Sequence, residues 1–340
     1  TIGTATRDVF IKSKDFQILK DPEHLKKIGI DTGIAQCFAF GGKMEMEQPI
    51  YVVGGGALNA ATTFSRMGLR TASFFRVGDD GPGLDIIKKV KDEKITPIVV
   101  KDNKMGTGYA VILLGGEGER SILAYRGASS SFKEGDISFK KLSSKAVYIA
   151  PGRISFNVMS KLVNHFKDSG ALVAMNPSGH YISMGMKKLK PIFKKLDVVI
   201  MNREEGAKLT KVDYKDENRI FSKLDEVVDG IAVMTDGPRG SLVSDGFDVH
   251  RAGVFPEKKL VDRTGAGDAF GSGFVAGIVE SKGDICHALR VASANATSVV
   301  EHVGAQEGAL SHKDLSSKRW KYLDLDVEKK RRLDIPATAA

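Results

Sequence analysis

The segment Asp262-Arg-Thr-Gly-Ala-Gly-Asp268 joins a glycine-rich turn to an acidic residue at the start of a helix built from small residues. At a helix start the backbone N–H groups lack intrahelical acceptors, and the helix dipole favours an anion. We therefore expect the N–H groups of Gly265, Ala266 and Gly267 to stabilise a transferring phosphoryl group. Asp268 would lie beside that anion, where its carboxylate can accept a proton from an attacking hydroxyl. The segment predicts phosphoryl transfer to an alcohol.

A structural interpretation of the same segment competes with this chemical one. An aspartate near a helix start can cap the helix, and glycines can permit close packing. For the later glycines Gly271, Gly273 and Gly277 we expect only packing of the helix against a sheet, because small residues favour close contact.

A second glycine cluster, which includes Gly54 and Gly55, leads from a short apolar strand into a helix expected over Ala60–Met67. Asn59 occupies the position at which a G-x-G-x-x-G dinucleotide turn has its third glycine, which argues against an NAD or FAD site. We expect instead that the bare backbone lets a polyol approach while Asn59 and Asp8 hydrogen-bond its hydroxyls. For Asp8 alone, a solvated turn residue is an equally good interpretation.

Two loops that follow apolar strands carry polar residues suited to a nucleotide. Asn202 and Glu205 lie three residues apart at a helix start, which suits water-mediated Mg²⁺ binding by oxygen ligands. The second loop offers the hydroxyl of Thr235 and chain bends at Gly237 and Gly240. The sequence has no Walker-type phosphate loop and no protein-kinase motif set, so we expect these strand-end loops to hold ATP.

The elements that must position these motifs alternate between strands and helices. Four apolar runs predict buried parallel strands: Ala146–Ala150, Leu172–Asn176, Val198–Met201 and Ile231–Thr235. The spacing of apolar residues in Phe156–Asp168 predicts an amphipathic helix. Repetition of this unit predicts an α/β fold, a doubly wound and mostly parallel sheet flanked by helices.

Two regions, at about residues 10–48 and 98–127, break this alternation. In the second, Thr107–Leu114 and Arg120–Tyr125 flank the turn Gly115–Gly118 as in a β-hairpin. We expect the two regions to form a small β-rich lid.

The lid is expected to be inserted in one α/β domain over residues 1–315, because no internal repeat or low-complexity linker divides the chain. Residues 316–340 are charged and show little apolar periodicity, which predicts a charged helix followed by a tail.

Composition narrows the classes of function. The chain has 340 residues, 42% of them hydrophobic, and a formal net charge of +9. The basic excess is spread over expected helix surfaces without interleaved aromatic residues, so we expect no nucleic-acid partner. No apolar run approaches the roughly 20 residues of a membrane span, and the first residues lack the apolar core of a signal peptide. The isolated Cys37 and Cys286 fit a reducing, cytoplasmic setting.

The motifs together resemble those of the ribokinase-like PfkB family of carbohydrate kinases, over about residues 1–315. Asp262-Arg-Thr-Gly-Ala-Gly-Asp268 is similar to the family's D-T-x-G-A-G-D signature, with Arg263 in place of the usual threonine. The resemblance implies that Asp268 is the catalytic aspartate.

Two further motifs match the family in the same order along the chain. Gly54-Gly55-x-x-x-Asn59 is similar to the N-terminal signature that contacts the sugar, and Asn202-x-x-Glu205 is similar to the N-x-x-E motif for Mg²⁺ and phosphate.

The resemblance also implies roles that the residues alone do not indicate. Thr235, Gly237 and Gly240 would line the ATP site, and Asn295 would border the adenine pocket.

Many relatives bind a monovalent cation near the anion site. The matching positions here are Asp262, Thr264 and the backbone of Gly304, and Gly308 stands where some ribokinases have a serine. The resemblance makes K⁺ a candidate further cofactor, and Gly308 is the departure from the family pattern that argues against it.

The expected activity is ATP- and Mg²⁺-dependent transfer of the γ-phosphate to a hydroxyl, preferably a primary alcohol, of a sugar-like substrate beneath a lid that excludes water. One alternative is a nucleoside kinase whose lid offers an aromatic cleft built from Phe10, Phe38, Phe40 and Tyr109. Another is a catalytically silent sugar-binding protein of the same fold. Because a small two-stranded element is marginal alone, the lid is also expected to support a homodimer.

Overall fold

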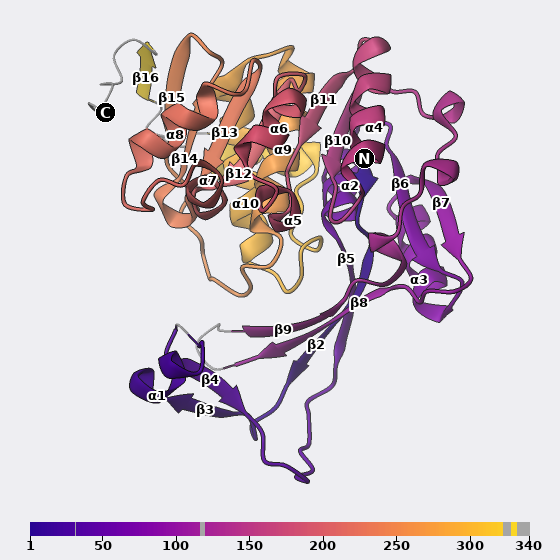
Figure 1. Ribbon diagram of the computed structural model, residues 1–340, viewed down its shortest axis with the longest axis vertical. Helices are drawn as coiled ribbons and strands as arrows, with labels where there is room; N and C mark the ends of the chain where they lie inside the picture. Colours follow the sequence, from indigo (N-terminus) through magenta and orange to yellow (C-terminus); the bar gives the residue numbers. More distant parts are fainter. Residues whose placement is uncertain (31, 116–119, 322–327, 332–340) are drawn as a thin grey trace.

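The computed structural model describes residues 1–30, 32–115, 120–321 and 328–331. It consists of an α/β body and a smaller β-rich lid that projects from one edge of the body (Figure 1). Among these described residues, no helix is both long and apolar enough to cross a bilayer.

The body is built on a ten-stranded sheet in the order β16-β15-β14-β13-β12-β11-β10-β1-β6-β7. The parallel strands are β1 (Ile2–Gly3), β6 (Ala72–Gly78), β7 (Thr96–Asp102), β10 (Ala146–Ala150), β11 (Leu172–Met175), β12 (Val198–Asn202) and β13 (Ile231–Thr235). An antiparallel edge follows with β14 (Ser241–Ser244), β15 (Asp248–Ala252) and β16 (Glu328–Arg331). The mostly parallel, doubly wound sheet confirms the expected fold class, and it brings the loops after its parallel strands to one edge.

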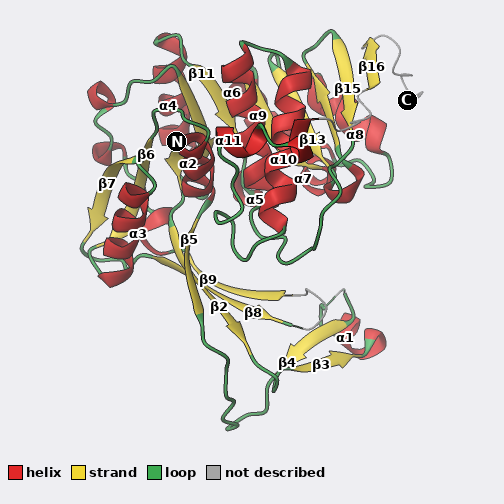
Figure 2. Cartoon of the chain, turned by 180° about the vertical axis from the view of Figure 1, so that it is seen from behind, coloured by secondary structure: helices red, strands yellow, loops and turns green. Residues whose placement is uncertain are grey.

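Helices cover both faces of this sheet (Figures 1 and 2). One face carries α2 (Gly56–Arg66), α3 (Gly81–Asp92), α9 (Ala266–Ser281) and α10 (Ile285–Val300). The other carries α4 (Phe156–Asp168), α6 (Met186–Phe193), α7 (Arg203–Thr210) and α8 (Glu217–Asp225). Side chains alternate along β10 accordingly: Val147 and Ile149 pack toward α4, and Tyr148 and Ala150 toward α9. Short helices complete the chain at α1 (Pro22–Lys27), α5 (Gly179–Ile182), α11 (His312–Leu315) and α12 (Lys318–Lys321).

The small residues of α9 allow close packing on two sides. A Cβ atom at Gly271 would lie 2.6 Å from the Tyr148 hydroxyl of β10, which confirms the expected contact with the sheet. A Cβ at Gly273 or Gly277 would instead lie 3.0 or 2.6 Å from Cα atoms of α10. These two glycines therefore serve helix–helix packing, which the helix periodicity alone could not distinguish from packing on the sheet.

The lid is a four-stranded sheet in the order β5-β2-β8-β9. Its strands are β2 (Thr6–Lys12), β5 (Ile50–Gly54), β8 (Gly108–Leu114) and β9 (Arg120–Tyr125). A two-stranded extension of β3 (Gln17–Lys20) and β4 (Ile34–Cys37) lies beyond it with α1 (Figure 2). The hairpin strand β9 matches its expected range, and β8 begins one residue after the expected Thr107. Most of the expected turn Gly115–Gly118 lies outside the described residues.

The lid segments differ from the expected ranges at their ends. Strands β2 and β5 extend the first segment to Thr6 and Gly54. Residues 98–102 belong instead to β7, which pairs with β6 in the body. An apolar run predicts a strand but not the sheet that it joins, because strand pairing is decided by tertiary packing.

The segment after residue 315 contains the expected charged helix, α12, but it differs from the expectation in being packed against the body. Trp320 of α12 is 9% exposed and packs edge-on against Phe255, with ring centroids 5.0 Å apart. Further along, β16 pairs with β15 and extends the main sheet. Residues 322–327 and 332–340 of the expected tail lie outside the described residues.

Candidate functional site

The glycine-rich turn leads directly into α9. Gly265 is its N-cap residue with φ 81°, a conformation that favours glycine, and a Cβ there would come within 2.2 Å of Ala305. Gly267 is exposed, and a Cβ on it would meet no atom within 4 Å. The first turn of α9, where N–H groups lack intrahelical acceptors, therefore borders open space that an anion can occupy.

Asp268 lies in this first turn, and its carboxylate is oriented from another helix. Its Oδ2 accepts a hydrogen bond from Asn59 Nδ2 of α2 at 2.8 Å. Asn59 Oδ1 in turn accepts one from Gln306 Nε2 at 3.1 Å. No side chain caps α9, so the structure does not support Asp268 as a helix cap. Burial raises the pKa of Asp268, and the Asn59 hydrogen bond acts in the opposite direction.

The glycine cluster brings the start of α2 against the base. The helix begins at Gly56, four residues before the expected start, because its N-cap Gly55 has φ 97° and needs no side chain for the turn. A Cβ at Gly56 would lie 2.8 Å from Ala150 Cβ and 3.2 Å from Asp268 Oδ1. The Gly56 N–H donates to Thr4 Oγ1 at 3.0 Å. Any side chain at position 56 would therefore disturb the base.

Asp8 lies in β2, not in a turn, so the structure contradicts its interpretation as a solvated turn residue. A Cβ at Gly54 would lie 2.2 Å from Asp8 Oδ2. Asp8 Oδ1 is buried and has no hydrogen-bond partner within the described parts of the chain. Burial raises the pKa of Asp8 to about 6, against the opposing effects of Thr6 and Arg7. A buried acceptor without a donor is rare unless a ligand or water supplies one.

Asn202 and Glu205 form a reciprocal capping box at the start of α7. Asn202 Oδ1 accepts from the Glu205 N–H at 2.8 Å, and Glu205 Oε2 accepts from the Asn202 N–H at 3.0 Å. Burial raises the pKa of Glu205, and the charges of Glu204 and Asp268 add to this effect. Asn202 also pairs with Thr235 across β12 and β13, so the two expected nucleotide loops lie side by side.

The donor set at this edge fits a water-mediated Mg²⁺ ion. The Glu205 carboxylate is an oxygen ligand of the kind that Mg²⁺ prefers, and a cation would offset the effects that disfavour its ionised form. Across the described residues, no group of three or more His, Cys, Asp or Glu side chains could hold a metal directly. One carboxylate is too few ligands for a dedicated metal cage, so Glu205 fits contact through water.

The loop after β13 depends on two glycines. Gly237 and Gly240 have φ 54° and 91°, and a Cβ at Gly240 would come within 1.9 Å of the Ala252 carbonyl oxygen. These values explain both glycines by backbone geometry alone. Thr235, half-buried at the end of β13, is therefore the residue of this motif whose side chain could contact a nucleotide.

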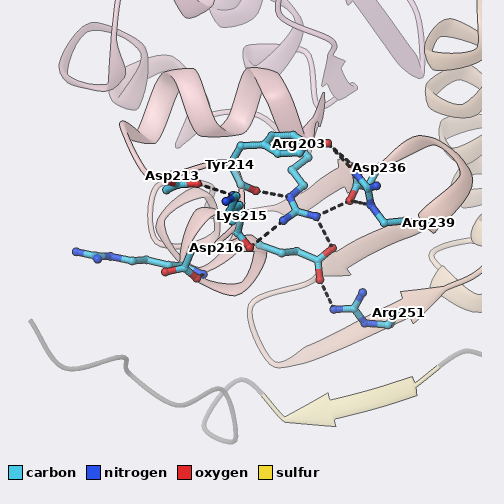
Figure 3. Close-up of polar contacts among 10 residues, drawn as sticks. Arg203, Asp213, Tyr214, Lys215, Asp216, Asp236, Arg239 and Arg251 are labelled. Atoms are coloured by element: carbon cyan, nitrogen blue, oxygen red, sulfur yellow. Dashed lines mark hydrogen bonds and ion pairs between the residues drawn. The ribbon is translucent and has the colours of Figure 1, made fainter.

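An ion-pair network that the sequence did not indicate joins the two loops expected to bind the nucleotide (Figure 3). Arg203, next to Asn202, donates to Asp236 Oδ2 at 2.7 Å and to the carbonyl oxygens of Tyr214 and Lys215 at 2.9 and 3.0 Å. Arg239 binds both carboxylate oxygens of Asp236 at 2.7 Å. Burial acts to raise the pKa of Asp236, but the two arginines outweigh it and hold the pKa below its usual value.

Asn295 lies in the interior of the body. Its side chain has no exposed surface; Nδ2 donates to Ala269 O at 2.8 Å and to Thr63 Oγ1 at 3.2 Å. Oδ1 accepts from the Leu310 N–H at 2.9 Å. The amide joins α10 to α2 and α9, and no part of it faces an open nucleotide site.

Asp262 ties the anion-binding turn to the loop after α10. Its Oδ1 accepts from the N–H and hydroxyl of Thr264, at 2.9 and 2.7 Å, and its Oδ2 accepts from the Gly304 N–H at 3.0 Å. Arg120 of β9 lies 3.9 Å from the same carboxylate and would compete with a K⁺ ion there. A Cβ at Gly308 would come within 2.3 Å of the Ser298 carbonyl oxygen, so packing excludes a serine at this position.

Arg66 at the end of α2 holds the loop that supplies Gln306. It donates to the carbonyl oxygens of Gln306, Glu307 and Ala309 at 2.8, 3.1 and 3.1 Å, and it pairs with Glu93 at 2.8 Å. The residues Arg66, Gln306 and Arg120 do not lie in any short sequence motif. Their partners lie far away in sequence, so the sequence alone offered no signal for them.

The four aromatic residues considered for a nucleoside cleft do not gather in one place. Phe10 is 2% exposed in the apolar core of the lid. Tyr109 lies on the opposite face of the lid sheet, since its register differs from that of Phe10 by an odd number of residues. Phe38 packs against Phe16 beyond the lid sheet, and Phe40 is fully exposed.

Comparison with known proteins agrees with this geometry. Residues 27–312 match the pfkB family carbohydrate kinase. The chain belongs to this family. An uncharacterized sugar kinase from Archaeoglobus fulgidus is 28% identical over 251 residues, which cover 72% of this chain and 96% of that protein. A nucleoside kinase from Methanothermobacter thermautotrophicus is 29% identical over 265 residues, with coverage of 74% and 80%.

The solved structures confirm the ribokinase-like fold. The structure of Arabidopsis thaliana ribokinase complexed with ribose and ATP has a TM-score of 0.75 at 21% identity and covers 95% of this chain and 98% of that chain. PfkB-family carbohydrate kinases are phosphotransferases that act on hydroxyl groups, so this chain is a sugar or nucleoside kinase.

Proposed function

We propose that the protein transfers the γ-phosphate of ATP to a primary alcohol of a sugar-like substrate, with Asp268 as the general base. The observation that carries this proposal is the carboxylate of Asp268, held by Asn59 at 2.8 Å in the first turn of a helix whose N-terminal side is open. A carboxylate so close to an anion-binding turn is disfavoured unless it reacts with the incoming hydroxyl.

In this mechanism Asp268 Oδ1, the oxygen that Asn59 does not bind, accepts the proton of the attacking hydroxyl. The N–H groups of Gly265, Ala266 and Gly267 stabilise charge on the transferring phosphoryl group. Glu205 would hold Mg²⁺ through water, and the ion would supply positive charge to the phosphate oxygens. The chain contributes mainly alignment and electrostatic stabilisation, because phosphoryl transfer needs little covalent participation by protein groups.

The acceptor's other hydroxyls would be bound where the lid meets the body. Asp8 Oδ1 is a buried acceptor that lacks a donor among the described residues, and a substrate hydroxyl can supply one. Gly54 and Gly55 leave the adjoining backbone free of side chains, so the acceptor can approach it closely. The amide of Asn59 would hydrogen-bond a further hydroxyl of the acceptor. On the nucleotide side we assign Asn202 and Thr235 to ATP, together with the loop whose bends at Gly237 and Gly240 shape that site, and we assign no role to Asn295.

The proposal is tested by measuring ATP consumption with a panel of acceptors: ribose, fructose, 2-keto-3-deoxygluconate, sugar phosphates and nucleosides. Turnover of at least one sugar-like acceptor, with the phosphorylated product identified by mass spectrometry, is the expected result. Turnover of nucleosides alone would favour the nucleoside-kinase alternative. ATP binding without turnover of any acceptor would favour a silent binding protein.

The remaining assignments are proposals of the same kind. We place residues 1–315 in one kinase domain with an inserted lid, and a homodimer would form through the exposed apolar residues of β9. The free thiols of Cys37 and Cys286 fit the cytoplasm. A K⁺ ion would act at Asp262, Thr264 and Gly304.

A further inference from the structure

A polar cavity of about 380 Å³ lies where the lid joins the body. It is lined by Thr4, Arg126, Ser129, Ser130, Gly152, Arg153, Ser178, Gly179, His180 and Ser183. The loops after β1, β10 and β11 form its body side. The lid side comes from the segment that directly follows β9. The cavity therefore combines strand-end loops of the sheet with the end of a lid strand.

The charge of this cavity is positive and unbalanced. Arg126, Arg153 and His180 line its wall, and all three are exposed to solvent. Of the residues that the structure describes, no aspartate or glutamate lines it. Within the described ranges neither arginine side chain has an ion-pair partner, whereas Arg66, Arg76, Arg203 and Arg319 are all paired with carboxylates. Unpaired guanidinium groups at a cavity wall favour an oxyanion, which they can bind with two parallel hydrogen bonds.

The loops that carry the two arginines are fixed by hydrogen bonds. The Ser178 hydroxyl donates to the Gly152 carbonyl oxygen at 2.5 Å, immediately before Arg153. The Ser129 hydroxyl donates to the carbonyl oxygen of Arg126 itself at 2.7 Å. The backbone positions of both arginines are thus set before a ligand arrives, which lowers the entropic cost of binding. The other side chains of the wall are hydroxyls, so it suits a hydroxylated anion better than an aromatic base.

A chain of contacts joins this cavity to the catalytic base. Thr4 of the cavity wall accepts a hydrogen bond from the N–H of Gly56 at 3.0 Å. Gly56 faces both Ala150 and Asp268 so closely that a Cβ would lie 3.2 Å from Asp268 Oδ1. Gly152 of the wall follows Ala150 by two residues. An acceptor whose hydroxyl meets Asp268 can therefore extend its far end toward the cavity.

We propose that this cavity binds an anionic group, a phosphate or a carboxylate, at the end of the acceptor opposite the reacting hydroxyl. The preferred substrate is then a sugar phosphate or a sugar acid, not a neutral sugar or a nucleoside. This inference rests on the proposed kinase function and adds its substrate class. Arg126 and Arg153 act as specificity-determining residues, because a neutral acceptor would leave both guanidinium groups without a counter-charge.

The first experiment compares kcat/KM for fructose 6-phosphate, 2-keto-3-deoxygluconate, fructose, ribose and adenosine. At least one of the two anionic acceptors should be preferred over the neutral ones by tenfold or more, and the phosphate and carboxylate arms identify the group. The KM of that acceptor should also rise with ionic strength, since salt screens the attraction. A preference for neutral acceptors would overturn the inference and leave the kinase proposal intact.

The second experiment uses Arg126→Gln and Arg153→Gln, with Arg70→Gln as an exposed arginine outside the cavity. Each cavity variant should raise the KM of the anionic acceptor by about 10- to 100-fold, as expected for a lost charge-assisted hydrogen bond, and leave neutral acceptors unchanged. Arg70→Gln should change neither. If the cavity variants raise the KM of ATP instead, the cavity holds a nucleotide phosphate and the inference is wrong.

Binding without turnover separates the two proposals. Isothermal titration calorimetry of the unmodified protein with fructose 6-phosphate and with 2-keto-3-deoxygluconate, in the absence of ATP, should show binding that both cavity variants weaken. If no acceptor in the panel is phosphorylated but this binding is seen, the cavity assignment stands and the kinase proposal fails. If neither anion binds, the cavity assignment fails.

Discussion

The carboxylate of Asp268 has two different oxygens: Asn59 donates to Oδ2, and Oδ1 faces Gly56. Asp268→Asn keeps the size of the side chain but cannot accept the alcohol proton. We expect kcat to fall by about 10²–10⁴-fold, or roughly 3–5.5 kcal/mol of barrier, while KM and ATP binding change little. Steady-state kinetics measure the loss, and thermal unfolding of the variant checks that the fold is intact. A kcat close to normal would show that Asp268 is not the base.

The same residue sets a prediction for pH. Because Asp268 must be ionised to act and burial raises its pKa, activity should fall on the acidic side at a higher pH than an ordinary aspartate would give. Asn59→Ala removes the donor that lowers this pKa, so the acidic limb of the kcat/KM profile should move to still higher pH. Gln306→Ala acts only through Asn59 and should give a smaller shift in the same direction. If the acidic limb stayed in place or moved to lower pH in these variants, Asn59 and Gln306 would not control the pKa of Asp268.

We expect the buried carboxylate of Asp8 to lower the free energy of unfolding at neutral pH. Its folded-state pKa of about 6 lies above the ordinary 3.8, so burial favours the protonated form. The penalty is absent below about pH 4, grows as pH rises through about 6, and reaches about 3 kcal/mol above that. Asp8→Asn should therefore increase the free energy of unfolding at pH 8 and not at pH 4, and it should raise the acceptor KM. Urea unfolding at both pH values measures this, with the exposed Asp92→Asn as control.

Individual residues were predictable from the sequence where chemistry depends on a short motif. Asp268 and Glu205 lie in such motifs, and the structure brings them close enough for the charge of Asp268 to raise the pKa of Glu205. Gln306 escaped prediction because it reaches Asn59 across 247 positions. Contacts of that range are set by how elements pack, and a single sequence carries no local trace of them.

At the scale of elements, β12 with α7 and β13 with its loop are held together by Arg203 and Asp236 (Figure 3). Arg203→Met should lower the free energy of unfolding by about 1–3 kcal/mol, less than a fully broken buried pair would cost, because Arg239 still pairs with Asp236. The KM of ATP should rise by about tenfold, with the acceptor KM unchanged, since only the nucleotide loops shift.

Two variants control this prediction. Arg203→Lys should not restore the ATP KM, because an ammonium group cannot reproduce the fork that binds Asp236 and two carbonyl oxygens. Arg251→Gln removes a neighbour whose ion pair among the described residues is with Glu217, and it should leave the ATP KM unchanged. Equal changes in both substrates' KM values would indicate a general structural defect and not loop positioning.

Elements with their own periodicity were predicted well. The expected ranges of β10, β13 and α4 equal the observed ones, because apolar runs and helical spacing are local properties. The prediction failed where an element's identity depends on its neighbours. The start of α2 was placed four residues late because its N-terminus is made of glycines, and residues 98–102 were assigned to the lid although β7 belongs to the body.

At the scale of the whole molecule, the lid presents an edge strand with apolar side chains to solvent. Ile122, Leu123 and Tyr125 of β9 are 52%, 60% and 54% exposed, and such an edge can pair with another copy. We expect a homodimer by light scattering, and Leu123→Lys should shift it toward monomer. Phe247→Lys, at an exposed phenylalanine between β14 and β15, should not. A monomeric unmodified protein would exclude this interface.

The loop at residues 304–309 supports several parts of the site at once. Its Gly304 N–H donates to the Asp262 carboxylate, and its Ala305 packs against Gly265 of the anion-binding turn. Its Gln306 side chain donates to Asn59, which in turn orients Asp268. Three of its carbonyl oxygens are held by the single guanidinium of Arg66. A local opening of these few residues would separate turn and base while the sheet stayed folded, because segments of a protein open with free energies below that of global unfolding. We therefore expect heat to inactivate this protein first by opening this loop at its Arg66 anchor, before the core unfolds.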